Sequence, residues 1–532
     1  MTASAPITQQ TSLISALENG WTRWPERIAL VHGAAEMTYR EMGSAILRLA
    51  DAYHSIGIRR GDRIACSVSN RPEQIIALGA AWACGALHVG LDYQFSPVEI
   101  SSVIELTKAS TLVLQPGDSF PDLKALRTQY PELRIFVVGD RLASEATAFS
   151  ALVDFGAPPD QSGRGSLESP SAPDPAIIFI SSGTTGRPKA TVGFHGNLAQ
   201  RWQRLSGWLK FGPTDVHLAQ LPLSHGFGLM MAMGALLTGG KLILLDRFSP
   251  DAVLRTVSTH GVTVLNGAPA HFKLILNSLD PTRHRTQSLR LSVGTAAFFP
   301  PELISSIWER LGVEFMFMYG SSEGVGVATT DRQDMLRGSV GKPAPGSVMI
   351  VGPDRQALPV GQTGEIAFSR QVFPVRYWEG SAASPPPFVA PQGADGKGPW
   401  YYSGDLGRVD EDGRLYVFGR VKHQIDRGGL KVDPVEVETA LLRCRGVADA
   451  AVLGHPNPIL GETVCACVVA APEATLTLEE LRSALQDRLA PYKLPEDLYV
   501  LDRIPRTQLG KVDLVKLKEN TASLAGQHVR RR

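Results

Sequence analysis

The sequence predicts an α/β protein with a large multi-sheet N-terminal domain and a small mobile α+β C-terminal domain. Three observations carry this prediction. The chain has 532 residues, more than one hydrophobic core usually organises, so two or more domains are expected. Short apolar runs alternate with amphipathic stretches through roughly the first 400 residues, which is typical of a mostly parallel sheet covered by helices. After Gly419 the pattern changes to a compact α+β unit of about 110 residues.

The domains are expected at residues 1–419 and 420–532, and a hinge at this boundary would let one domain move against the other. Within the first domain, the strand-like run RIACSVS precedes the helical run PEQIIALGAAWACGA. Two segments, 157–175 and 379–398, have loop composition and are expected to be surface connections.

Composition excludes several classes of protein. Apolar residues make up 43% of the chain and the formal net charge is +1, so no strongly basic face for nucleic acid is expected. Cys465 and Cys467 are two residues apart in an apolar strand-like run, so they share one face of the strand, and both are expected to be buried. Since the N-terminus lacks a signal peptide and the longest apolar run, 229–237, is too short to span a bilayer, a cytoplasmic protein without a membrane span is expected. The protein is expected to be a monomer or a homodimer.

The most informative segment is IIFISSGTTG, residues 177–186, followed by RPK. An apolar strand leads into small hydroxyl residues and glycines, which together present several N–H and O–H donors to one concavity, as phosphate oxygens require. A plain Ser/Gly surface turn is the alternative, and the Walker pattern does not match. The expected phosphate-binding residues are Ser181, Ser182, Gly183, Thr184, Thr185, Gly186 and Lys189.

SSGTTGRPK resembles the phosphate loop of the AMP-forming adenylating superfamily, which includes acyl- and aryl-CoA synthetases, peptide-synthetase adenylation domains and firefly luciferase. The final Gly that is usual in that family is Ala190 here. Five motifs that resemble the family occur in its order, and the resemblance spans about residues 10–515. It implies an enzyme that uses ATP and Mg²⁺ to join a carboxylate to AMP.

Two motifs imply how the nucleoside is held. MYGSSE (318–323) resembles the family element whose tyrosine, here Tyr319, stacks on adenine beside Gly320, Ser321 and Ser322, while Glu323 holds Mg²⁺. YYSGDLG (401–407) resembles the ribose element, so Asp405 would accept hydrogen bonds from both ribose hydroxyls and Arg420 would contact the same sugar.

GTAAF (294–298) departs from the family. Thr295 replaces a small residue and Phe298 replaces proline, which weakens the implied nucleotide role of Ala296 and Ala297. In LPLSHGFGL, the resemblance implies that His225 gates the channel that carries the thiol; a packed structural histidine is the alternative.

The C-terminal segment IPRTQLGKVDL resembles the family's Pro-Arg-Thr-x-x-Gly-Lys motif. The resemblance implies that Lys511 stabilises the negative charge that gathers on the α-phosphoryl oxygens. Apart from the resemblance, a lysine in a glycine turn is usually a solvated surface charge. The resemblance also implies a hinge at Lys422 and a loop around Gly429 that faces the pantetheine tunnel after domain rotation. The implied catalytic set is Lys511, Glu323, Thr184 and His225.

The implied reaction has two steps. A carboxylate attacks the α-phosphate of ATP and releases pyrophosphate, and a thiol, coenzyme A, then takes the acyl group. A free-standing adenylation enzyme that loads the phosphopantetheine of a carrier protein stays an alternative, as does a nucleotide-binding protein without turnover. The acid is not identified, although an Asp placed to hold a substrate amine is not evident, which argues mildly against an α-amino acid.

Overall fold

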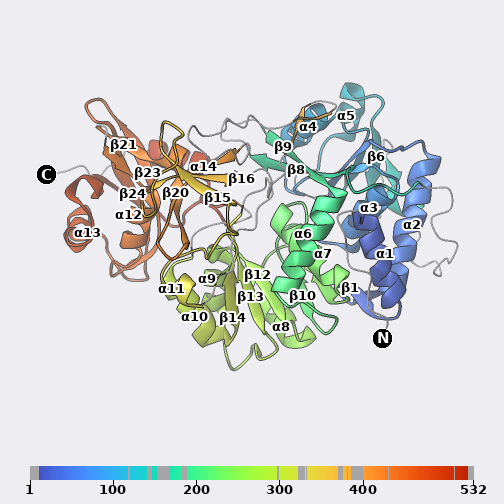
Figure 1. Cartoon of the computed structure of the whole chain (residues 1–532), viewed down its shortest axis with the longest axis horizontal. Helices are drawn as coiled ribbons and strands as arrows, with labels where there is room; N and C mark the ends of the chain where they lie inside the picture. The colour runs from blue at the N-terminus through green and yellow to red at the C-terminus, as the bar shows by residue number, and fades with distance from the viewer. Residues whose placement is uncertain are drawn as a thin grey trace.

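The protein is described from a computed structural model. The structure describes residues 11–117, 120–139, 146–152, 168–182, 188–295, 299–320, 330, 332–369, 376–379, 382–384, 400–428, 430–507 and 510–524. A large N-terminal domain of several sheets and a smaller C-terminal domain lie side by side (Figure 1), which confirms the predicted fold class.

Two large sheets form the body of the N-terminal domain. In spatial order, the first contains β18 (Ala382–Ser384), β17 (Tyr377–Glu379), β9 (Pro188–Phe194), β8 (Pro175–Ser182), β4 (Leu87–Gly90), β3 (Arg63–Ser67), β5 (Thr111–Leu114), β6 (Arg134–Val137) and β7 (Thr147–Ala148). The second contains β14 (Glu314–Phe317), β13 (Leu291–Gly294), β12 (Val264–Gly267), β10 (Val216–Ala219), β11 (Lys241–Leu244), β1 (Ile28–His32) and β2 (Ala35–Thr38). Most neighbouring strands are parallel, as predicted.

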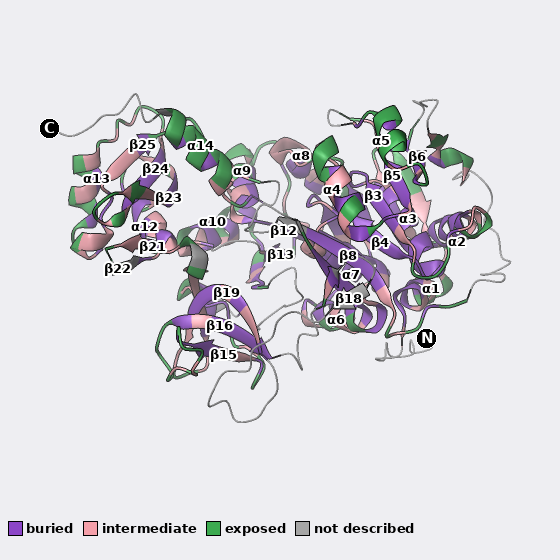
Figure 2. Ribbon diagram, turned by 90° about the horizontal axis from the view of Figure 1, so that it is seen from above, coloured by how far each residue is buried: buried purple, intermediate pink, exposed green. Residues whose placement is uncertain are grey.

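Helices fill the space between the two sheets and cover their outer faces (Figure 2). The inner helices share one hydrophobic core with both sheets; they are α1 (Leu13–Arg23), α2 (Tyr39–Ser55), α3 (Pro72–Ala83), α6 (His195–Trp208) and α7 (Gly226–Leu237). The outer helices are α4 (Pro97–Thr107), α5 (Leu123–Gln129), α8 (Pro250–His260), α9 (Pro269–Ser278), α10 (Pro301–Leu311) and α11 (Arg332–Leu336). Among the described residues, no helix combines the length and apolar character needed to cross a membrane.

A third, antiparallel sheet leads toward the C-terminal domain, which has a core of its own. The third sheet contains β15 (Val348–Val351), β16 (Gly364–Ser369), β19 (Trp400–Val409) and β20 (Leu415–Arg420). The C-terminal domain contains β21 (Ile425–Arg427), β22 (Leu430–Val432), β23 (Val447–Asn457), β24 (Gly461–Ala470) and β25 (Asp497–Val500), with α12 (Pro434–Leu441), α13 (Leu478–Leu485) and α14 (Leu514–Leu524). Three short 3₁₀ helices are Phe149–Ala151, Val421–His423 and Pro491–Lys493.

Some expected loops are strands. Pro175 starts β8, and the segment expected as a connection at 379–398 begins on β17 and contributes β18, which pairs with β17 at the edge of the first sheet. Whether an edge segment forms a strand depends on its pairing with a neighbouring strand, and composition alone does not reveal that pairing. Conversely, Cys465 and Cys467 are both buried on β24, as expected.

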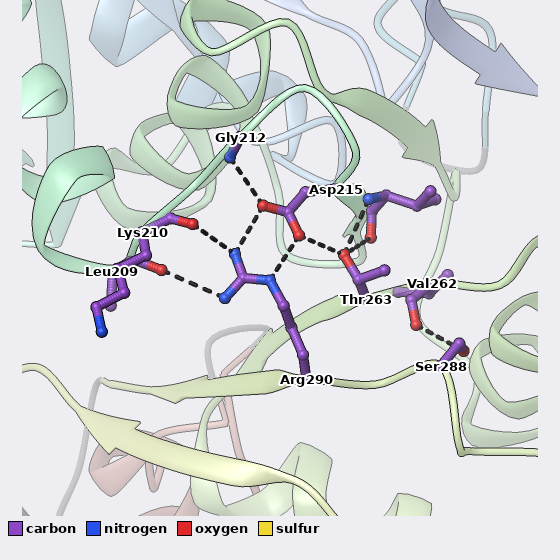
Figure 3. Close-up of polar contacts among 9 residues, drawn as sticks. Leu209, Lys210, Gly212, Asp215, Val262, Thr263, Ser288 and Arg290 are labelled. Carbon is purple, nitrogen blue, oxygen red and sulfur yellow. Dashed lines mark hydrogen bonds and ion pairs between the residues drawn. The ribbon is translucent and has the colours of Figure 1, made fainter.

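A polar network connects the amino ends of β10, β12 and β13 in the second sheet (Figure 3). The Arg290 guanidinium donates two hydrogen bonds to the Asp215 carboxylate, each 2.6 Å long, and Thr263 donates a third of 2.8 Å. Burial opposes ionisation of Asp215, but these bonds outweigh it and lower the pKa of the carboxyl. The network thereby fixes β12 and β13 relative to β10.

Two buried histidines make stability depend on pH. Burial lowers the pKa of His88 to about 3 and that of His217 to about 4, from 6.5. Below about pH 6.5 the unfolded chain therefore binds protons that the folded chain does not, so this contribution to stability is present above pH 6.5 and is lost as pH falls toward 4. At about 1.4 kcal/mol per pKa unit, each histidine costs about 2 kcal/mol between pH 6.5 and 5.

We expect the thermal unfolding midpoint to fall between pH 7 and 5, and to fall less steeply in His217→Phe, whose ring does not titrate. His54→Gln is the matched control, because His54 is exposed near the end of α2 and should leave the slope unchanged. An unaltered slope in His217→Phe would contradict the assignment.

Candidate active site

A cavity of about 450 Å³ lies between the two domains. The N-terminal domain contributes Tyr319 and Gly320, which follow β14, and the third sheet contributes Asp405 and Arg420. The C-terminal domain contributes Lys511. The structure thus brings together five residues that the sequence placed in four separate segments.

Asp405 is held by two partners inside the cavity. It faces Arg420 across the β19–β20 pair, and its Oδ1 lies 2.7 Å from Arg420 Nε. The Tyr319 hydroxyl donates a 2.6 Å hydrogen bond to Asp405 Oδ2. A carboxylate offers about four acceptor positions, so it can accept from several donors at once. These two contacts hold the carboxylate in place within the cavity.

Tyr319 lines the cavity, and its hydroxyl donates to Asp405. The residue is 8% exposed. Burial, and then the neighbouring Asp405 carboxylate, raise the pKa of the tyrosine hydroxyl well above its usual value, so it stays protonated and donates at neutral pH. The sequence indicated an aromatic face for adenine but gave no sign of this hydroxyl contact, because residues 319 and 405 meet only in the folded chain.

Lys511 projects from a tight turn. Thr507 N donates to Lys511 O at 2.7 Å, and Gly510 N donates to Thr507 O at 2.8 Å. Gly510 has φ +72°, and a Cβ there would lie 3.2 Å from the Cβ atoms of Ala268 and Ala270. The left-handed backbone therefore favours glycine, and a side chain there would also crowd the start of α9. This contact brings the turn to the carboxyl end of β12.

His225 immediately precedes α7. Its Nε2 lies 3.2 Å from Asp92 Oδ2, and Asp92 itself is buried just after β4. Gly90, at the end of β4, packs so closely against Ser224 that a Cβ would lie 2.9 Å from the Ser224 carbonyl oxygen. Asp92 was missed from the sequence, since nothing local in LDYQ indicates a histidine partner more than a hundred residues away. The carboxylate restrains the imidazole that was expected to gate the channel.

Other expected residues lie at the edge of the described structure or outside it. The backbones of Ser181 and Ser182 complete β8, Lys189 is exposed on β9 and pairs in register with Ser181, and the backbone of Lys422 lies in the 3₁₀ helix after β20. Their predicted roles stay predictions. The residues outside the described part of the chain are Gly183, Thr184, Thr185, Gly186, Ala296, Ala297, Ser321, Ser322, Glu323 and Gly429.

Comparison with known families assigns both parts of the chain. The model of the AMP-binding enzyme family matches residues 17–378, and the model of the AMP-binding enzyme C-terminal domain matches residues 436–511. The chain belongs to the AMP-binding enzyme family. This confirms the predicted AMP-forming adenylating superfamily, and with it the prediction of an enzyme of the AMP-forming acyl-CoA synthetase kind.

Several curated AMP-binding relatives match the chain over most of its length. A feruloyl-CoA synthase from Amycolatopsis sp is 31% identical over 92% of this chain and 94% of its own. An indoleacetate–CoA ligase from Aromatoleum aromaticum is 30% identical over 94% of both chains. Triostin synthetase I from Streptomyces triostinicus is 30% identical over 96% of this chain and 94% of its own.

Solved structures of the AMP-binding fold match as well. An anthranilate CoA ligase in complex with anthranoyl-AMP superposes with a TM-score of 0.84 at 23% identity, covering 99% of this chain and 100% of that one, which shows the fold. The o-succinylbenzoate CoA synthetase from Bacillus subtilis, in complex with its acyl-adenylate intermediate, gives a TM-score of 0.77 at 26% identity, covering 96% and 98%.

Proposed function

We propose that the protein is an ATP-dependent ligase that activates an aryl or medium-sized acyl carboxylate as its acyl-adenylate and transfers the acyl group to coenzyme A. The observation that carries the proposal is the cavity in which Lys511 of the C-terminal domain shares one space with Tyr319 and Asp405. An ammonium, an aromatic face and a fixed carboxylate are what the phosphate, adenine and ribose of ATP require. Curated relatives that are named CoA ligases for aromatic acids support the class of acid.

In the first step, a substrate carboxylate oxygen forms a bond to the α-phosphorus of ATP, and the bond from that phosphorus to pyrophosphate breaks. Asp405 and Tyr319 orient the nucleoside, while Lys511 stabilises charge on the phosphoryl oxygens. In the second step, the thiol sulfur attacks the acyl carbon, AMP leaves and the thiol proton passes to water. Mg²⁺ held by Glu323 stays a prediction, since Glu323 lies outside the described residues.

The two steps call for a change of pose. Lys511 lines the nucleotide cavity in this structure, which we assign to the adenylating pose. Rotation of the C-terminal domain about Lys422 would withdraw Lys511 and bring the loop at Gly429 to the thiol channel. The domain boundary at 419–420 and this rotation are part of the proposal.

The function is tested with a panel of carboxylates that includes ferulate, indoleacetate, anthranilate, salicylate and acetate. Pyrophosphate release is measured for each with ATP and Mg²⁺, and CoA or a pantetheinylated carrier protein is then added separately. We expect release with at least one aromatic acid and a thioester with CoA. Loading of the carrier without any CoA thioester would favour a free-standing adenylation enzyme, and absence of pyrophosphate release with every acid would refute the proposal.

His225→Ala should slow thioester formation from supplied acyl-adenylate by about tenfold, because loss of the 3.2 Å contact between the His225 imidazole and Asp92 leaves the channel mouth unrestrained. Misplacement of a reacting group by about 1 Å can cost up to about 100-fold. Adenylation should change less than about threefold. Stopped assays of each half-reaction measure the two rates. His260→Ala is the matched control, since His260 ends α8 at the surface and should alter neither rate. A selective loss of adenylation would contradict the gate role.

A further inference from the structure

Three charged side chains form a continuous ionic chain across the domain interface. Lys273, on α9 of the N-terminal domain, places its Nζ 3.5 Å from Oδ1 of Asp449, on β23 of the C-terminal domain. Arg506 donates two hydrogen bonds to the same carboxylate, 2.9 Å to Oδ1 and 2.7 Å to Oδ2. All three side chains line the cavity between the domains and are about a quarter to a third exposed, at 31%, 23% and 25%.

This series of ionic contacts extends to the turn that carries Lys511. Arg506 Nη1 donates a 3.0 Å hydrogen bond to the carbonyl oxygen of Gly510, the residue directly before Lys511. Arg506 also pairs with Val512 in an antiparallel bridge, so it contacts the turn through both its backbone and its side chain. One guanidinium is thus shared between the Asp449 carboxylate and the turn, and the position of Asp449 bears directly on that of Lys511.

We propose that Lys273 and Asp449 are positioning residues for the adenylation half-reaction alone. The Lys273–Asp449 ion pair holds the C-terminal domain against the N-terminal domain. Because Arg506 contacts both Asp449 and the Lys511 turn, it couples the position of the turn to that docking. This inference rests on the proposed function of Lys511 and on the rotation between the two steps. Because the pair joins the two domains, rotation must break it. A partly exposed ion pair with a 3.5 Å separation is weak enough to be broken and remade in each cycle.

A second ion pair between the domains supplies a matched control. Arg443, two residues after the end of α12, lies 3.2 Å from Glu302 of α10, and both side chains are about half exposed or more, at 48% and 61%. This pair also joins the domains in the present pose, but among the described residues no hydrogen bond or ion pair links it to the Lys511 turn. It therefore separates general domain docking from control of the turn.

The test compares wild type, Lys273→Met, Asp449→Asn and Arg443→Met with an acid for which the wild type releases pyrophosphate. Lys273→Met should slow pyrophosphate release about fivefold, and Asp449→Asn about tenfold, because the latter removes the charge that faces both cations. Thioester formation from supplied acyl-adenylate and CoA should stay within about twofold of wild type in both, since that step does not use the docked pose. Arg443→Met should leave both steps within about twofold.

Salt and a conservative variant extend the test. The adenylation rates of wild type and Lys273→Met should converge as NaCl is raised, because salt screens a partly exposed pair. Lys273→Arg keeps the charge and should keep adenylation within about twofold. Thermal unfolding midpoints establish that each variant is folded, and Lys273→Gln replaces Lys273→Met if the latter is not.

Either of two results in Lys273→Met would overturn the inference: equal losses in both half-reactions, or adenylation that equals that of wild type. Failure of the proposed function would look different, because the wild type itself would then release no pyrophosphate with any acid. A deficit in Arg443→Met as large as in Lys273→Met would also overturn the inference, since docking in general would then explain both.

Discussion

Replacing Lys511 with alanine is expected to slow acyl-adenylate formation about 100-fold while leaving thioester formation from supplied acyl-adenylate largely intact. The ammonium lines the cavity shared with Tyr319 and Asp405, where charge develops on the phosphoryl oxygens. Loss of one preorganised group that stabilises such charge costs about 2.7–4 kcal/mol in comparable sites. Because Lys511 is exposed in this structure, the expected loss lies at the lower end of that range. Pyrophosphate release and CoA thioester formation, each measured in a single turnover, give the two rates.

Lys516→Ala is the matched control for Lys511→Ala. Lys516 lies five residues further along, on α14, and its side chain is 70% exposed beside Asp513. It should change neither half-reaction by more than about twofold, because exposed ion pairs contribute little. If Lys511→Ala slowed both steps equally, the lysine would have a structural role and the assignment of this pose to adenylation would fail.

The sequence predicted which residues lie in the cavity better than it predicted the contacts between them. Tyr319, Asp405 and Arg420 were each assigned to the nucleoside from short motifs, because an aromatic ring, a carboxylate and a guanidinium carry their chemistry in any fold. That Tyr319 donates to Asp405, and that Arg420 lies opposite it on the next strand, depends on strand pairing between segments far apart in the chain. Sequence alone does not set that register.

The interface between the domains was the least predictable part. Lys273, Asp449 and Arg506 lie on separate elements, and each looks like an ordinary charge on a helix, a strand or a turn. Their meaning comes from docking, which places α9 of one domain beside β23 of the other. The change of pattern after Gly419 predicts a boundary there, since hydrophobic periodicity is local, and that boundary stays a prediction. Periodicity carries no information on how two units dock.

Asp405→Asn is expected to reduce pyrophosphate release about 100-fold, chiefly by raising the KM for ATP. Asparagine keeps the size of the side chain but removes the charge that holds Arg420 at 2.7 Å and that would accept both ribose hydroxyls. Hydrogen bonds to a charged group contribute about 1.5–3 kcal/mol each, so weakening two of them accounts for about 100-fold, or about 2.7 kcal/mol. Initial rates of pyrophosphate release over a range of ATP concentrations give KM and kcat.

Two variants decide whether the effect belongs to the nucleoside. Asp412→Asn removes an exposed carboxylate from the turn between β19 and β20 and should leave the KM for ATP unchanged. Tyr319→Phe keeps the ring but deletes the 2.6 Å bond to Asp405, so it should raise the KM for ATP by about threefold to tenfold, less than Asp405→Asn. An Asp405→Asn enzyme with a normal KM for ATP and a raised KM for the acid would place the carboxylate at the acyl group, and the nucleoside role assigned to the Asp405–Tyr319 pair would be wrong.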